Sequence, residues 1–212
     1  MRSVSDTAKA GLSLAGAVPV TALAAAAALQ LAWNVTGSVA AADWLGVALL
    51  AALLVVVVLA AGAAVRPARL AVVSLGLLGA YGAWVALSIS WSPLPTLAKE
   101  EAQLVLLYAL VLAVALLSLR SARERVVALG AVAFAPAVVA LGTGVRLVRA
   151  DDATAFFPDG RLELPIAYAN ADAALFLLGL WPALVLAAGR AIPVAVRAAA
   201  LGAASVCLAG WI

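Results

Sequence analysis

Long runs of apolar residues, separated by short polar segments, dominate the chain. A helix that crosses a membrane needs about 20 apolar residues to cover a hydrocarbon core about 30 Å thick. Lipid offers no hydrogen-bonding partner, so each backbone N–H and C=O in such a run must be satisfied inside a helix. The pattern predicts about seven spanning segments, over residues 11–33, 44–65, 70–90, 104–119, 126–145, 169–188 and 194–212.

The fourth predicted segment is short for a span unless its helix begins earlier, near Leu97. Thr96 could cap such a helix. Glu100 and Glu101 would then lie in its first turns, where the helix dipole favours acids. Elsewhere, prolines lie inside three of the predicted spans, and we expect each to kink its helix. They are Pro19, Pro136 and Pro182.

Composition agrees with this pattern, because 67% of the 212 residues are hydrophobic, 11% are charged and the mean hydropathy is +1.19. A water-soluble domain of this size cannot bury so much apolar surface in its core. There is no histidine and a single cysteine, Cys207, which excludes disulfides, Cys/His zinc sites and Ser/His dyads within the chain. We therefore expect an all-α polytopic membrane bundle, one transmembrane domain over residues 1–212, with no metal, cofactor or nucleic-acid partner.

Basic residues predict the orientation of the bundle, since short cytoplasmic loops carry an excess of Lys and Arg. With the N-terminus inside, nine basic residues fall on the cytoplasmic side: Arg2, Lys9, Arg66, Arg69, Arg120, Arg123, Arg125, Arg190 and Arg197. Four fall outside: Lys99, Arg146, Arg149 and Arg161. The bias predicts a cytoplasmic N-terminus and an extracytoplasmic loop over residues 146–168.

The longest polar stretch between predicted spans runs from Arg146 to Pro165. Its basic residues, Arg146, Arg149 and Arg161, are the only arginines predicted on the outer side. A guanidinium group binds two phosphate oxygens at once. Next to a membrane, these side chains could hold the diphosphate of a lipid carrier whose tail stays in the bilayer.

A simpler interpretation also fits this stretch. The first two arginines could pair with Asp151 and Asp152 in water. Residues 158–160, Pro-Asp-Gly, have the composition of a turn that would leave Arg161 in solvent. Both interpretations stay open.

Polar side chains also enter the sixth predicted span, at Tyr168, Asn170 and Asp172. An ionised Asp at the centre of a spanning helix costs about 2.5–3.5 kcal/mol on insertion scales, and less near the helix end. Asp172 could meet Arg161 or another helix, or could serve a transported cation or proton. Asn170 could instead cap the helix.

Two stretches taken together resemble the O-antigen ligase-like family of bacterial polytopic membrane proteins. The first, from Ser90, reads SWSPLPTLAKEEAQLVLLYALVL, with a Trp-Ser-x-x-Pro turn opening a span that contains Leu-Leu-Tyr. The second, from Gly160, reads GRLELPIAYANADAALFLLGLWPALVLA, with a Gly-Arg-Leu stretch leading into Tyr-x-Asn-Ala. The resemblance covers roughly residues 84 to 190 and rests on the order and spacing of the two stretches.

The resemblance implies metal-independent glycosyl transfer on the outer face of the bacterial inner membrane. A glycan would move from an undecaprenyl diphosphate carrier, a lipid-linked oligosaccharide, onto an acceptor. By the Gly-Arg-Leu match, Arg161 would contact the diphosphate and stabilise the leaving group. Arg146 and Arg149 are proposed for the same role from their position alone.

The chain also departs from the family pattern. It has neither a large outer loop nor a histidine, residues 163–166 differ from the expected glycine-containing turn, and Asp172 replaces an uncharged residue. We therefore expect an N-terminal part of such a glycosyltransferase, inactive without its C-terminal half. The alternatives are a transporter or flippase-like carrier and a non-catalytic truncated remnant.

Overall fold

The computed structural model describes residues 14–33, 41–62, 64, 67–166 and 168–211. These residues form helices and contain no strand, which confirms the all-α fold class. The α-helices are α2 (Val18–Trp33), α3 (Ala41–Ala60), α4 (Arg69–Ser88), α5 (Pro95–Ser118), α6 (Ala122–Arg149), α7 (Ala169–Ala188) and α8 (Val194–Trp211). Three short 3-10 helices accompany them: η1 (Ala15–Ala17), η2 (Ala153–Phe156) and η3 (Pro158–Gly160).

Five of these helices, α3 to α7, are long and apolar enough to cross a membrane. Apolar helices at α2 and α8 are shorter. Each of the seven α-helices overlaps one of the predicted segments. The chain therefore has the helices of a multi-pass membrane protein, whereas the count of seven spans and the cytoplasmic N-terminus stay predictions.

The chain divides into two compact units. The first holds α3, α4, α5 and the start of α2 as far as Leu23, and α5 packs against both α3 and α4. Ala51 and Val114 are fully buried in its small core. A Cβ atom on Gly82 would lie 3.2 Å from Cγ1 of Val105, so a glycine lets α4 and α5 approach closely.

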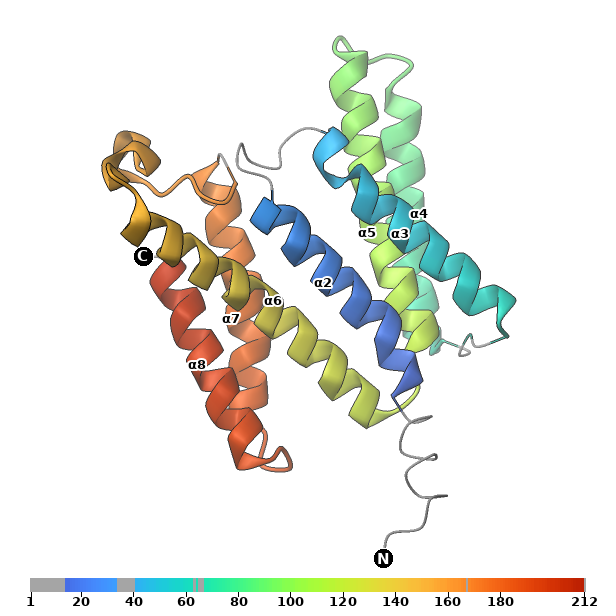
Figure 1. The fold of residues 1–212 in the computed structure, drawn as a ribbon. Coiled ribbons are helices and arrows are strands. Elements are labelled where there is room, and N and C mark those ends of the chain that lie inside the picture. Colours follow the sequence, from blue (N-terminus) through green and yellow to red (C-terminus); the bar gives the residue numbers. More distant parts are fainter. Residues whose placement is uncertain (1–13, 34–40, 63, 65–66, 167, 212) are drawn as a thin grey trace, which may run out of the picture. The chain divides into compact units, whose positions relative to one another are not determined.

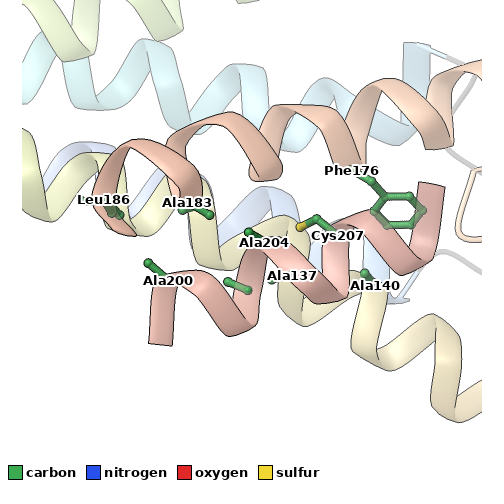
Figure 2. Packing of buried hydrophobic residues seen from close by; sticks show 10 residues of the cluster. Ala137, Ala140, Phe176, Ala183, Leu186, Ala200, Ala204 and Cys207 are labelled. Atoms are coloured by element: carbon green, nitrogen blue, oxygen red, sulfur yellow. The ribbon is translucent and has the colours of Figure 1, made fainter. Parts of the chain in front are cut away.

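The second unit contains the rest of α2, from Ala24, together with α6, α7 and α8, and each of these last three helices packs against the other two (Figure 1). Small side chains dominate its core, around the ring of Phe176 (Figure 2). The buried members are Ala133, Ala137, Ala140, Phe176, Ala183, Leu186, Ala200, Ala203, Ala204 and Cys207.

Gly179 of α7 lies close to both α6 and α8. A Cβ atom there would lie 2.8 Å from Cβ of Pro136, in α6, and 2.9 Å from Sγ of Cys207, in α8. Real Cβ atoms essentially never make such short contacts. Lipid tails are as apolar as the helix surfaces, so the hydrophobic effect does not drive helices together inside a membrane. Close packing at small residues such as Gly179 contributes to their association instead.

Large apolar side chains cover much of the surface of the first unit. Helix α4 has no buried residue, and Leu70, Leu77 and Trp84 are 80%, 68% and 64% exposed. A monomeric protein in water rarely exposes so continuous an apolar surface. This surface fits contact with membrane lipid.

The start of α5 corrects one prediction. The helix begins at Pro95, after an N-cap at Leu94 that makes no side-chain hydrogen bond. Thr96 therefore lies inside the helix, so the prediction that it caps α5 was wrong. The first turn contains no acid, and Glu100 and Glu101 lie beyond it. Pro95 suits the first helical position, because the backbone N–H of that residue has no partner within the helix and its absence loses no hydrogen bond.

The prolines also differ from one another. Pro136 and Pro182 lie inside α6 and α7, as predicted. Pro19 is the second residue of α2, so the prediction that it lies inside a spanning helix and kinks it was wrong. The backbone N–H groups of the first turn of a helix have no partner within that helix, so a proline at this position removes no hydrogen bond.

Candidate polar and apolar hollows at the α6–α7 loop

The described residues of the loop between α6 and α7, 150–166 and 168, make several local hydrogen bonds. The Asp152 carboxylate accepts hydrogen bonds from the backbone N–H and the hydroxyl of Thr154, and these bonds lower the pKa of Asp152 from its ordinary value of 3.8. Gly160 has a φ of +73°, a left-handed conformation that suits glycine. The backbone N–H of Glu163 then donates to Phe156 O at 3.0 Å and closes the loop on itself.

Asp172 joins this loop to the start of α7. Its Oδ1 accepts a hydrogen bond from the backbone N–H of Ile166 at 3.0 Å. The side chain is only 2% exposed, and its Oδ2 has no hydrogen-bond partner among the described residues. The partner of Asp172 is therefore a loop amide, and no ion pair links it to Arg161 in the described structure.

Asn170 does not cap α7, contrary to one of the interpretations of the sequence. The N-cap is Tyr168, without a side-chain capping bond, and Asn170 lies in the first turn of the helix. Its Nδ2 donates instead to the hydroxyl of Tyr168 at 3.0 Å. Both side chains are exposed.

A polar cavity of about 310 Å³ lies between the loop and the helix ends. Arg161, Asn170 and Asp172 line it together with the ring of Phe157. The structure thus brings three of the predicted site residues to one cavity. A second hollow of about 380 Å³, lined by Arg161, Glu163, Tyr168 and Asn170 among others, adjoins it.

An apolar groove of about 700 Å³ runs beside the polar cavity, between the C-terminal ends of α6 and α8. Its walls are mainly aliphatic, and Arg149 contributes the one charged side chain among the residues that line it. Phe157, Leu162 and Gly210 line both the groove and the cavity, so the two lie next to each other. A Cβ atom on Gly210 would lie 3.1 Å from the ring of Phe176, so the glycine lets α8 pack closely against α7 here.

The three arginines that were predicted to contact a diphosphate lie at different positions relative to these hollows. Arg161 is exposed and lines both polar hollows, whereas Arg149 lines the apolar groove. Arg146 is half-buried in the last turn of α6 and lines none of these three hollows. The Asp152 carboxylate, which one interpretation paired with these arginines, accepts hydrogen bonds from Thr154, and η3 forms the turn of that interpretation, after which Arg161 is exposed.

Sequence reasoning missed Phe157, Leu162 and Gly210, which shape the junction between the two hollows. No local signal marks them as neighbours, because Gly210 lies about fifty residues from the others and reaches them only through the packing of α8. Among the described residues, no group of three or more His, Cys, Asp or Glu side chains could hold a metal ion.

No protein-family model, curated protein or solved structure matches the chain. The helices themselves define its class, a helical protein with several segments suited to a membrane. The resemblance to the O-antigen ligase-like family stays a prediction.

Proposed function

We propose that the chain is an O-antigen ligase-like membrane protein that binds an undecaprenyl diphosphate-linked glycan on the outer face of a bacterial inner membrane. The observation that carries the proposal is that an apolar groove adjoins a polar cavity at one end of the second unit. A lipid-linked oligosaccharide is likewise divided into an apolar part, the isoprenoid tail, and a polar part, the diphosphate and the sugars.

The charges suit this ligand. The tail fits the groove between α6 and α8, where apolar side chains replace water. Arg149, on the groove, and Arg161, on the cavity, are then available for the diphosphate oxygens on either side of the junction. Such charge-assisted hydrogen bonds are stronger than neutral ones, and the same guanidinium groups would stabilise a leaving diphosphate.

We propose further that these residues bind the carrier and do not transfer the glycan alone. The sequence has no histidine, the side chain most often used for general acid-base catalysis at neutral pH. The chain would then serve as the carrier-binding part of a glycosyltransferase, with other groups completing the reaction.

The position of Asp172 supports this proposal over a transporter. Secondary transporters place substrate and ion sites near the middle of the bilayer. Asp172 lies in the first turn of α7 and bonds to a loop amide, so it belongs to the loop end of the helix.

Binding of undecaprenyl diphosphate to the purified chain in lipid nanodiscs tests the proposal. Arg149→Ala and Arg161→Ala should each weaken binding by about 10-fold or more, as loss of a charge-assisted hydrogen bond does. Arg190→Ala is the matched control, because Arg190 is exposed in the α7–α8 connection, at the other end of α7. Absence of saturable binding, or equal weakening by the control, would overturn the proposal.

A further inference from the structure

One residue on the wall of the polar cavity has a buried oxygen with no hydrogen-bond partner among the described residues. Asp172 lines it, is almost fully buried, and uses Oδ1 for the Ile166 amide while Oδ2 has no partner among the described residues. Buried polar atoms are hydrogen-bonded in most proteins, and an exception points to an absent partner. A carboxylate oxygen accepts only, so the missing partner must be a hydrogen-bond donor.

The other groups on the cavity wall restrict that donor. Arg161 contributes a positive charge beside the negative charge of Asp172, so the pair gives no net preference for a cation. Asn170 adds an amide, whose oxygen accepts and whose remaining N–H donates. A neutral ligand with several hydroxyl groups can satisfy acceptors and donors together.

The remaining wall is apolar, which fits the faces of a sugar ring. Phe157 is 38% exposed and lies where the cavity joins the groove, and Ala169, Ala173 and Gly210 leave room around it. The volume of about 310 Å³ is at the lower end of the range for small-molecule sites, about 300–1,000 Å³. One sugar ring, with its apolar face on Phe157, suits such a space.

We propose that this cavity binds the sugar next to the diphosphate, and that Oδ2 of Asp172 accepts a hydrogen bond from one of its hydroxyl groups. This inference rests on the proposed function. It gives Asp172 the role of distinguishing the glycosylated carrier from the bare carrier. The diphosphate itself is bound by Arg149 and Arg161, as in the proposed function. Asp172 is therefore a specificity-determining residue for the glycosylated carrier and contributes nothing to binding of the bare carrier.

Asp172→Asn is the sharpest test, because an amide can keep the oxygen that accepts from Ile166 while replacing Oδ2 with an N–H donor. The ligands are undecaprenyl diphosphate alone and the same lipid carrying glucose, galactose, rhamnose or N-acetylglucosamine. The wild-type chain should bind at least one glycosylated lipid about 10-fold more tightly than the bare lipid. The variant should lose that difference and bind the bare lipid as before.

Failures of the two proposals can be told apart. If the wild-type chain binds neither form, the proposed function fails. If it binds the bare lipid but none of the four sugars adds affinity, or if Asp172→Asn weakens both forms equally, the sugar site fails. Saturable binding of ²²Na⁺ that Asp172→Asn abolishes would also overturn it, in favour of a cation site. Thermal unfolding of the variant, equal to that of the wild type, confirms that the loop contact is kept.

Discussion

Arg197 of α8 donates a hydrogen bond from Nε to the backbone O of Ala187, in the last turn of α7, at 2.8 Å. The last carbonyl groups of a helix have no partner within it. A cation near this end also interacts favourably with the helix dipole. One half-buried side chain therefore joins two helices of the second unit at the end away from the loop.

Replacing this arginine should destabilise the second unit. Arg197→Gln should lower the free energy of unfolding by about 1.5 kcal/mol, the value of a hydrogen bond from a charged donor, and the melting temperature by about 3–6 °C. Thermal unfolding in detergent, followed by circular dichroism, measures the change. Arg190→Gln, exposed in the α7–α8 connection, should leave the melting temperature unchanged; equal losses in the two variants would contradict the role given to Arg197.

Gly179→Ala should destabilise the second unit through overpacking. The added methyl group would lie 2.8 Å from Cβ of Pro136 and 2.9 Å from Sγ of Cys207, so α6 or α8 must move. Insertion into a packed core of this kind costs about 1–3 kcal/mol. Gly142→Ala, on α6 and with no atom within 4 Å of the new Cβ, is the control. A melting temperature for Gly179→Ala at or above that of the control would refute the close packing.

The loop around Asp152 should respond to acid. Its folded-state pKa lies below the ordinary value of 3.8, so its contribution to stability is present above about pH 3.8 and is lost as the pH falls through the folded pKa. Thr154→Val removes the hydroxyl donor and should raise the pKa towards 3.8. Carboxyl ¹³C shifts of labelled aspartate, followed against pH, report both values. An unchanged titration of Asp152 in the variant would contradict this cause.

Helices were the most predictable part of the molecule, because the length of an apolar run and the cost of unsatisfied backbone groups leave few alternatives. Helix starts were harder to predict. Helix α5 begins at Pro95, before the start expected near Leu97, because a proline at the first helical position competes with side-chain capping by Thr96.

The candidate site could be predicted only in part. The sequence placed Arg161, Asn170 and Asp172 at one end of one span, and they do share a cavity. It could not show that Asp172 bonds to the Ile166 amide, because every residue offers such a group. Nor could it show that α8 brings Gly210 to the cavity, since this contact follows from the packing of three helices.

The orientation of the chain is open to direct labelling. Cys207 is buried and is the only cysteine, so a Cys207→Ala background can carry one new thiol at a time. Ala155→Cys, in the α6–α7 loop, and Ala191→Cys, in the α7–α8 connection, replace exposed residues at opposite ends of α7. The charge bias predicts that a membrane-impermeant maleimide labels the first on intact bacterial cells and the second only after permeabilisation. The reverse pattern would place the arginines of the candidate site in the cytoplasm, where an outer-face glycan carrier could not reach them.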